Sequence, residues 1–458
     1  MLFQSQVFLL GFLPVTLALW YGLAERAALR EWCLLACSLV FYAWWDPRFL
    51  PLLLGQGLVS WLAAEFYQRS AKRPRGMLVA AIVANICVLA FFKYWTFLVE
   101  NLAATLGLQL PAYSIILPIG ISFYTFEIIS YLVDLGWRGA PHYNLRRFGL
   151  FVAFFPRLIA GPIVRHNEII PQFDLAPLRE GVAERVGQGA TLLVLGLAKK
   201  LFLADRLAPI ADAAFRAGAD QAPPLATAWT GALAFTFQLF LDFSAYSEMA
   251  IGIALMLGLN LPRNFEAPYQ SLDIRDFWQR WHMTLSRYFR DYLYIPLGGN
   301  RHGTATLIGA TLATMGLCGL WHGAGWTFIA WGLMHGMGLI VYRGWHALDR
   351  PLPAALAWAL TFLFVVVGWV LFRATGFAMA RHMLTGLVGV GGLGGRLEQP
   401  LLLASAAAVA MFGPTTRAFV SETLRPWPAA GAVIGLLAAA VVLETAKGQP
   451  VSFIYFQF

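Results

Sequence analysis

The sequence is short of charge. Asp, Glu, Lys and Arg make up 12% of its 458 residues, about half the share of roughly 25% that is usual in a water-soluble protein. Apolar residues make up 59%, and the mean hydropathy is +0.64. So little charge does not cover a soluble surface of this size, and apolar runs recur from one end of the chain to the other. The composition therefore excludes a soluble globular protein and predicts an integral membrane protein.

Cysteine is scarce as well: the four cysteines lie in apolar stretches, and none forms a Cys-x-x-Cys pair. We therefore expect no disulfide framework and no metal site. Although the net charge is +9, no basic stripe with interleaved aromatic residues predicts binding of nucleic acid. The first apolar run lacks a preceding basic residue and a small-residue cleavage site, which indicates a retained membrane span rather than a signal peptide.

The apolar runs predict an all-α, polytopic helical bundle. We expect about 10–11 transmembrane helices, with re-entrant and interfacial helices beside them because several runs are shorter than about 18 residues. No internal repeat or low-complexity linker interrupts the sequence, so we expect one domain over residues 1–458. The runs lie near residues 6–23, 32–45, 49–67, 77–98, 115–135, 148–164, 187–204, 226–243, 245–259, 305–321, 324–342, 354–372, 400–413 and 430–445.

Basic residues between the early runs predict the orientation. Lys and Arg accumulate in cytoplasmic loops, and basic loops at 24–30, 69–75 and 138–147 follow the first, third and fifth runs. We therefore expect these loops in the cytoplasm and the N-terminus outside, with the chain in the inner (plasma) membrane. After residue 148 the alternation is lost, because Pro156 and Pro162 interrupt the sixth run and favour a half-span.

Residues 271–302 interleave arginines with aromatic residues. The segment is too charged to span a membrane and predicts an amphipathic helix at the interface, with its rings at headgroup depth; Ser271 with Asp273 can cap its start. The arginines either neutralise lipid phosphates or bind a phosphate-bearing donor, and the presence of His282 among them favours the donor. The candidate donor-binding residues are Arg275, Arg280, Arg287 and Arg290.

A second histidine, His322, lies between two apolar runs, at a depth where an ionisable residue is a functional candidate by default. Two G-x-x-x-G motifs, starting at Gly319 and Gly332, allow close helix packing and leave room for a narrow channel. Two interpretations stay open: His322 is catalytic, or it is a hydrogen-bonded residue on a packing face. His335 is the rival candidate, about one span further along.

Three acidic residues also fall in apolar surroundings: Glu127, Asp242 and Glu248. A buried carboxylate needs a partner. Pairing with an arginine or a hydroxyl is the usual explanation, and the alternative is that one of them orients a catalytic imidazole. Cys318, four residues before His322, is an alternative covalent carrier of an acyl group, although a small apolar filler is the more common role for such a residue.

The two histidine segments together resemble the membrane-bound O-acyltransferases. They read RDFWQRWHMTLSRYFRDYLYIPLGGN and GLWHGAGWTFIAWGLMHG, and the resemblance extends over most of the chain through FYAWW, ILPIGISFYTFEIISYLVD, FPRLIAGPIVR, FLDFSAYSEMAIGIALMLG and FIYFQF. Within that family the sequence is similar to the branch that acts on bacterial polysaccharides. The resemblance implies a bundle with a cytoplasmic funnel, a central tunnel and an opening to the outer face. It also implies that His322, in WHG, is catalytic and that His282 occupies the second position of the site.

These observations predict transfer of an acyl group across the membrane. The resemblance implies acetyl-CoA as the acyl donor, a substrate rather than a bound cofactor, with its phosphates near the four arginines. His322 is expected to act as general base on an acceptor hydroxyl, since a neutral imidazole can take a proton. His282 is expected to position the donor or to stabilise developing charge. The expected acceptor is an exopolysaccharide, reached directly or through a periplasmic acetyltransferase partner.

Two hypotheses from other classes compete with an enzyme. A transporter of the polysaccharide or acyl group would also be polytopic, but transporters often contain paired internal repeats, and none is visible in the sequence. A non-catalytic scaffold of a polysaccharide synthase complex predicts that His322→Ala leaves acetylation intact. Consumption of acetyl-CoA distinguishes the enzyme from both.

Overall fold

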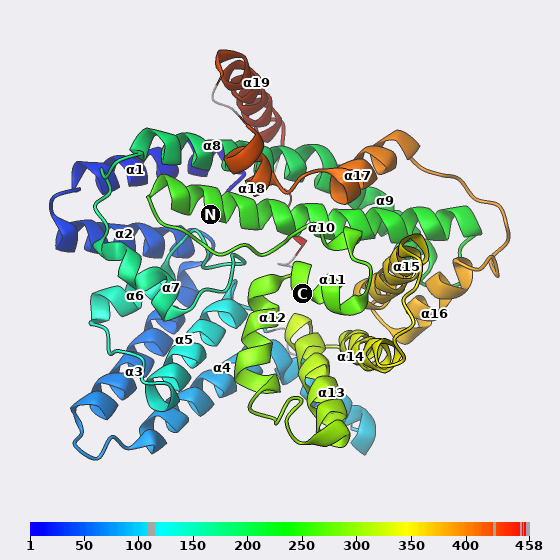
Figure 1. Ribbon diagram of the computed structural model, residues 1–458, viewed down its shortest axis with the longest axis horizontal. Coiled ribbons are helices and arrows are strands. Elements are labelled where there is room, and N and C mark those ends of the chain that lie inside the picture. Colours follow the sequence, from blue (N-terminus) through cyan, green and yellow to red (C-terminus); the bar gives the residue numbers. More distant parts are fainter. Residues whose placement is uncertain (109–114, 425–426, 449–450, 452, 455–458) are drawn as a thin grey trace. The chain divides into compact units, whose positions relative to one another are not determined.

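We describe the fold from a computed structural model, in which residues 1–108, 115–424, 427–448, 451 and 453–454 are described. All regular elements among them are helices (Figure 1), as expected where lipid leaves backbone groups to be satisfied within the chain. Seven helices in these residues are long and apolar enough to cross a membrane, and two shorter ones, Val7–Gly22 and Pro400–Phe412, are also apolar. The all-α, multi-span prediction is therefore confirmed.

The chain folds as two compact units. Unit 1 comprises Met1–Val194, Ser247–Pro262 and the described part of Gly431–Ser452. Unit 2 comprises Leu195–Tyr246 and the described parts of Arg263–Ala430 and Phe453–Phe458. Each unit is described by itself below, and the expectation of a single domain stays a prediction.

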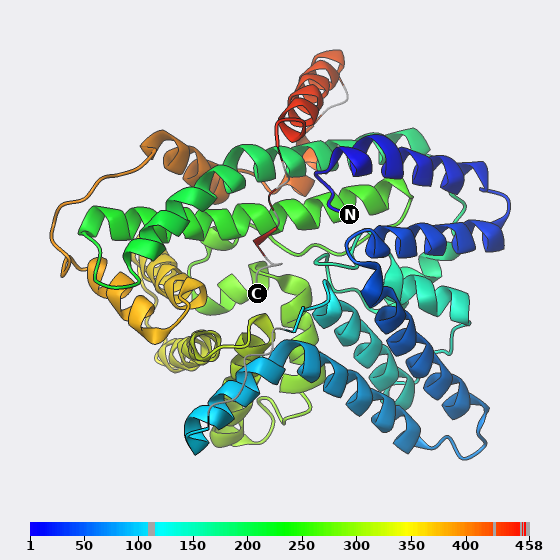
Figure 2. The same cartoon turned by 180° about the vertical axis from the view of Figure 1, so that it is seen from behind.

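Unit 1 follows the predicted runs closely; α3 and α4, for example, lie side by side (Figure 2). α5 starts later than the run at 115, because Pro118 and Gly120 precede it and Gly120 has a left-handed backbone (φ +76°). The elements of unit 1 are η1 (Val7–Phe12), α1 (Leu13–Gly22), α2 (Ala27–Ala43), η2 (Pro47–Phe49), α3 (Leu50–Arg69), α4 (Arg75–Leu106), α5 (Ile121–Trp137), α6 (Leu145–Ala153), α7 (His166–Ile169), η3 (Ile170–Asp174), most of α8 (Val182–Ala198), the end of α10 (Leu225–Met256) and most of α19 (Pro428–Thr445).

The sixth run is a half-span, as predicted. α6 ends at Ala153, and no helix forms again before His166. The non-helical stretch between them is buried and is held by Glu127, which pairs with Arg157 and accepts a hydrogen bond of 3.3 Å from the Val164 N–H. Glu127 is therefore a structural carboxylate, paired with an arginine as expected.

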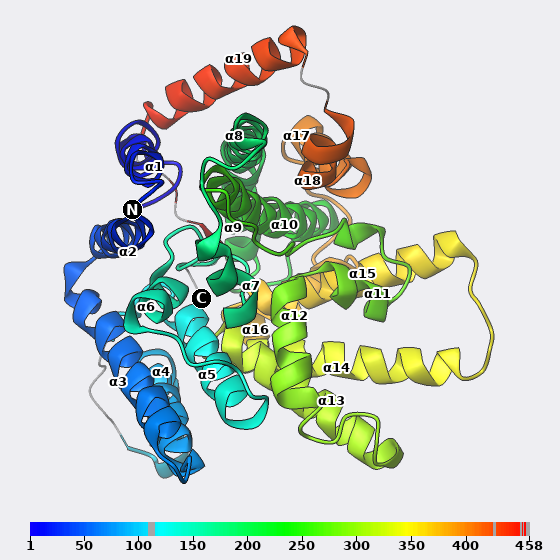
Figure 3. The ribbon, with the colours of Figure 1, turned by 60° about the vertical axis from the view of Figure 1, so that its left-hand side comes forward.

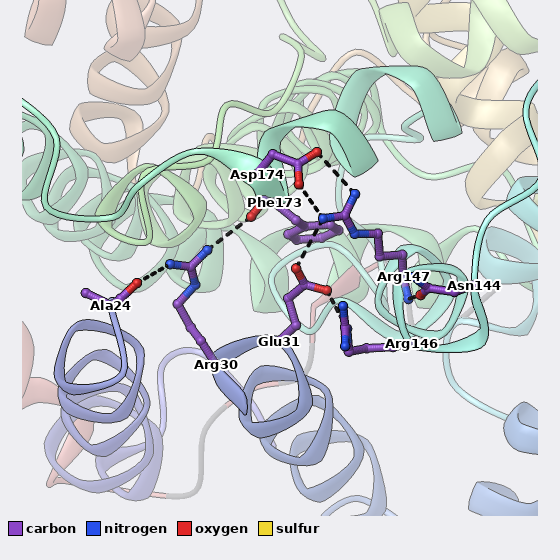
Figure 4. Close-up of polar contacts among 8 residues, drawn as sticks. All are labelled: Ala24, Arg30, Glu31, Asn144, Arg146, Arg147, Phe173 and Asp174. Carbon is purple, nitrogen blue, oxygen red and sulfur yellow. Dashed lines mark hydrogen bonds and ion pairs between the residues drawn. The ribbon is translucent and has the colours of Figure 1, made fainter. Parts of the chain in front are cut away.

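The predicted basic loops meet at one end of the unit 1 helices. Glu31, at the start of α2, binds Arg146 (2.6 Å) and Arg147 at the start of α6 (Figure 4). Glu65, near the end of α3, binds both Arg69 and His142. Residues 24–31, 65–75 and 138–147 therefore lie on the same side of unit 1.

The first residues lie at the opposite end of α2. The Met1 amino group donates to the Phe41 carbonyl (3.0 Å), whereas Arg30, at the start of α2, donates to the Ala24 and Phe173 carbonyls (Figure 4). This arrangement agrees with the predicted alternation of loops up to residue 147. The assignment of the basic side to the cytoplasm stays a prediction.

One long helix, most of which belongs to unit 2, was divided in two by the sequence analysis. We predicted separate spans at 226–243 and 245–259, and this was wrong: α10 (Leu225–Met256) runs without a break. Ser244, at the predicted break, donates back to the Leu241 carbonyl within the helix (3.5 Å), an arrangement that α-helices tolerate. Most of α10 is buried, so its unit 2 part lies in the core of that unit rather than facing lipid.

The other elements of unit 2 are mostly close to the predicted runs. One run, 187–204, extends further than predicted, since α8 continues through η4 into α9. The remaining elements of this unit are η4 (Lys199–Ala204), α9 (Asp205–Ala217), η5 (Pro268–Gln270), α11 (Ile274–Arg280), α12 (Met283–Phe289), η6 (Arg290–Tyr294), α13 (Gly303–His322), α14 (Trp326–His346), α15 (Ala354–Arg373), α16 (Phe377–Gly386), α17 (Pro400–Phe412), α18 (Thr416–Ala418) and η7 (Phe419–Thr423).

Glycine lets α13 and α14 pack backbone to backbone (Figure 3). A Cβ added at Gly319 would overlap the Phe328 carbonyl oxygen, and one added at Gly332 would overlap the Met315 carbonyl oxygen. The packing function predicted for the G-x-x-x-G motifs is therefore confirmed at Gly319 and Gly332. It fixes the end of α13, where His322 lies.

Candidate active site

The arginine-rich segment forms two short helices instead of one interfacial helix. α11 is capped by Asp273, whose carboxylate accepts from the Asp276 N–H (2.7 Å), as predicted. The helix then breaks at His282, which has a left-handed backbone (φ 43°, ψ 51°). Phe277 and Trp281 are buried in unit 2, so these two rings pack inside the protein and do not face lipid; their predicted position at headgroup depth stays a prediction.

The structure brings the two candidate histidines together. His322 is the last residue of α13, and His282 precedes the first residue of α12. Their ring centroids are 6.4 Å apart, and their exposed fractions are 4% and 0%. Two residues that are distant in the sequence therefore form one buried site within unit 2.

Aromatic rings surround this pair. Trp331 and Phe372 contact the His322 ring at centroid distances of 5.1 and 5.3 Å, and Phe243 contacts the His282 ring edge-on at 4.7 Å. Burial lowers the pKa of His282 to about 3, because an apolar site disfavours the charged form. His282 is therefore a neutral imidazole at physiological pH.

His335, the rival candidate, lies in the same aromatic cluster but not beside His322. The Trp331 ring separates them, at 4.9 Å from His335 and 5.1 Å from His322. The Trp278 indole N–H donates to Nδ1 of His335 (3.2 Å). A histidine fixed in this way supports the aromatic wall.

The four candidate donor-binding arginines come from three elements. Arg275 on α11 and Arg290 on η6 are exposed. Arg280 donates to Asp276 and Arg290 to Asp291, each at 2.7 Å, while Arg287 on α12 is half-buried. Partners of this kind leave a guanidinium able to bind a second anion. Binding of a phosphate-bearing donor by these residues stays a prediction.

Asp242 pairs with a lysine rather than with the predicted arginine or hydroxyl. Its carboxylate lies 2.7 Å from Nζ of Lys200, which also pairs with Asp205 (2.6 Å). It also accepts from the backbone N–H of Ile454 (2.6 Å). The structural explanation for Asp242 is thus confirmed, although its partner lies on the π-helix η4 and was missed. Glu248, the third acidic candidate, is half-buried on α10.

Comparison with known proteins identifies the family. The family model of MBOAT, the membrane-bound O-acyltransferases, matches residues 138–380, which include both histidines. The chain belongs to this family. It is 46% identical over 406 residues to the probable alginate O-acetylase AlgI of Pseudomonas aeruginosa, covering 85% of this chain and 75% of the relative. It is 38% identical over 429 residues to the peptidoglycan O-acetyltransferase of Helicobacter pylori, covering 86% and 81%.

A more distant relative is named for a different activity. The teichoic acid D-alanyltransferase of Streptococcus thermophilus is 31% identical over 242 residues, covering 50% of this chain and 57% of the relative. Membership of the family confirms the expectation of an O-acyltransferase enzyme, and the transporter and scaffold hypotheses are set aside.

The residue that orients an imidazole is an amide and not a carboxylate. Oδ1 of Asn264, which precedes η5, lies 3.0 Å from Nδ1 of His282. Asn264 belongs to no periodic pattern and to no charged segment, so sequence reasoning missed it. The available signal was weak: a polar residue shortly after a long apolar run and 18 positions before a candidate histidine.

Proposed function

We propose that this acyltransferase moves an acetyl group from cytoplasmic acetyl-CoA to a hydroxyl on the other side of the inner membrane. The acceptor is an extracytoplasmic polysaccharide or a periplasmic acetyltransferase partner that passes the group on. The observation that carries the proposal is the buried pair His282 and His322, at a ring separation of 6.4 Å. The relatives named as acetylases of alginate and peptidoglycan support acetyl as the group and a glycan as the acceptor.

His322 is the proposed general base. Its imidazole takes the proton of the acceptor hydroxyl while that oxygen attacks the thioester carbonyl. The tetrahedral intermediate then collapses, the C–S bond breaks, and the thiolate of CoA leaves. The imidazolium returns the proton to the thiolate or to water, which restores neutral His322. Because a thiolate leaves readily, no further strong acid is needed.

In this proposal the donor enters from the cytoplasm. CoA carries phosphates that do not cross a bilayer, so they stay at the cytoplasmic mouth, near some of Arg275, Arg280, Arg287 and Arg290. Exposure of Arg275 and Arg290 supports this placement. The basic loops of unit 1 are proposed to lie in the cytoplasm on the separate ground of their charge. His282 then either positions a substrate or stabilises developing charge.

The acetate content of the polysaccharide tests the proposal. A strain lacking the gene is complemented with wild type, His322→Ala, His282→Ala or Cys318→Ala, and the membrane level of each protein is measured. General-base catalysis contributes about 10²–10⁴-fold, so His322→Ala should abolish measurable acetylation at a normal protein level. Cys318→Ala, one helical turn away on α13, should retain it.

Three outcomes contradict the proposal. Full acetylation by a normally expressed His322→Ala variant would exclude His322 as the base. A covalent mechanism would replace general-base catalysis if Cys318→Ala loses acetylation and an acyl group is trapped on Cys318 of the wild-type protein. Retention of acetylation in membranes without acetyl-CoA would exclude the proposed donor.

A further inference from the structure

Asn264 holds the turn that carries His282. It is 1% exposed, and both its backbone and its side chain bind the residues at the start of α12. The Asn264 carbonyl accepts from the Met283 N–H (2.9 Å). Oδ1 accepts from the Thr284 hydroxyl (2.9 Å) and from the Thr284 N–H (3.4 Å), and it lies 3.0 Å from Nδ1 of His282. One buried residue thus fixes three consecutive positions.

These contacts determine which nitrogen of His282 carries the proton. A backbone N–H can only donate, so the Asn264 atom that faces Thr284 must be the oxygen rather than the amide nitrogen. An oxygen of this kind can only accept, so Nδ1 of His282 must carry a hydrogen. In a neutral imidazole the lone pair then resides on Nε2. His335 has the opposite arrangement, because its Nδ1 accepts from Trp278.

The backbone of His282 is also held in an unfavourable conformation. Five non-glycine residues in the described part of the chain have a positive φ, and His282 is one of them, at φ 43°. For a residue with a Cβ this region is sparsely populated, and such conformations gather at functional sites, where the surroundings enforce them. The hydrogen bonds from Asn264 to residues 283 and 284 supply that enforcement.

We propose that Asn264, together with Thr284, is the positioning residue that keeps His282 as a hydrogen-bond acceptor at Nε2. The inference rests on the proposed function, because it assigns a task to the second histidine of the site. The single N–H of neutral His282 is bound to Asn264, so His282 has no hydrogen to offer an oxyanion. It therefore orients a substrate group that carries a hydrogen. That group is either the acceptor hydroxyl or an N–H of the acyl donor.

Nitrogen-15 NMR of the purified full-length protein, labelled at the histidine rings, tests the tautomer directly. The signals of His282 are assigned by their absence in His282→Gln. We expect a protonated Nδ1 and a bare Nε2 in the wild type, and a mixture of tautomers in Asn264→Leu. A proton on Nε2 of the wild type overturns the proposal, and this measurement requires no active variant.

Kinetics in vesicles, with acetyl-CoA as donor and deacetylated alginate oligosaccharide as the acceptor probe, tests the consequence. Asn264→Leu should lower kcat/KM by about 10–100-fold, because a misplacement near 1 Å has an effect of that order. Asn264→Asp keeps an acceptor atom at Nδ1 and should retain more activity than Asn264→Leu. If Asn264→Leu raises KM for acetyl-CoA alone, Nε2 of His282 binds the donor. If it raises KM for the oligosaccharide alone, Nε2 binds the acceptor hydroxyl.

A matched control separates positioning from loss of a buried amide. Asn85 is another buried asparagine, bonded to Gln56 and Ser60 in unit 1, so Asn85→Leu should leave the His282 signals and both KM values unchanged. If His322→Ala is inactive while Asn264→Leu keeps the wild-type tautomer and wild-type kinetics, this inference fails and the proposed function stands. If His322→Ala is fully active, the proposed function itself is wrong, whatever the tautomer of His282.

Discussion

An alanine at Gly319 or Gly332 should push α13 away from α14 and displace His322. A Cβ at Gly319 would overlap the Phe328 carbonyl oxygen, and one at Gly332 would overlap the Met315 carbonyl oxygen, whereas ordinary contact begins at 3.4 Å. Both obstacles are backbone atoms inside helices, so no side-chain rotation relieves them. The two helices must separate by roughly 1 Å, and a displacement of that size at a reacting group can lower a rate about 10²-fold.

The same substitution should lower stability. Forcing an extra methyl into a filled interface costs about 1–3 kcal/mol, which outweighs the roughly 0.5–1 kcal/mol that alanine gains over glycine within a helix. Gly309 provides the control, because it lies on α13 and a Cβ there meets nothing within 4 Å. Gly309→Ala should therefore be neutral or slightly stabilising.

Thermal unfolding of the detergent-purified variants, together with acetyl transfer in vesicles, checks both effects. We expect Gly319→Ala and Gly332→Ala to unfold at a lower temperature than Gly309→Ala and to transfer acetyl far more slowly per folded molecule. Wild-type stability and wild-type rate for Gly319→Ala would refute the reasoning, because a Cβ at this position would then fit between α13 and α14 without moving either helix.

Three further predictions use the same unfolding assay. Lys200→Met leaves the buried carboxylate of Asp242 without its cation and should destabilise by about 3–5 kcal/mol, whereas Arg48→Met, at an exposed pair, should not change the midpoint. Glu31→Gln removes the partner of Arg146 and should lower the midpoint at high salt as well as low, because Glu31 is buried. Burial lowers the folded-state pKa of His282 to about 3. Below about pH 6.5 the unfolded chain therefore binds a proton at His282 that the folded chain does not bind, so the free energy of unfolding falls as the pH falls. Between pH 6.5 and 5 the loss should be about 2 kcal/mol, and His282→Gln should remove that part of the pH dependence.

Much of the fold and both histidines could be predicted from the sequence. Lipid requires backbone groups to pair within the chain, so an apolar run of sufficient length has few alternatives to a helix, and most run boundaries were accurate. His282 and His322 were identifiable because an ionisable residue among apolar neighbours needs a reason to be there. The half-span after residue 148 followed from prolines alone.

Tertiary contacts decided what the sequence did not reveal. Residues 271–302 have the composition of one interfacial helix, but hydrogen bonds from Asn264 hold a left-handed turn at His282 and divide the segment. Lys200 was not considered, because its partner Asp242 lies on α10, far from it along the chain. Neither contact leaves a periodic signal, since Asn264 lies well before His282 and Asp242 lies far from Lys200 along the chain.

The continuity of α10 also has a consequence for the site. Asp242 and Phe243 are adjacent on this helix, and they bind different partners: Asp242 holds Lys200 and the Ile454 N–H, while Phe243 packs against the His282 ring. Two successive helical residues keep a fixed relative direction, so the buried ion pair and the wall of the histidine site are rigidly connected. A break at Ser244, as the hydropathy pattern implied, would end the helix directly after Phe243 and weaken the support behind His282. A rigid element behind each reacting group is what precise placement requires, and one unbroken helix supplies it here.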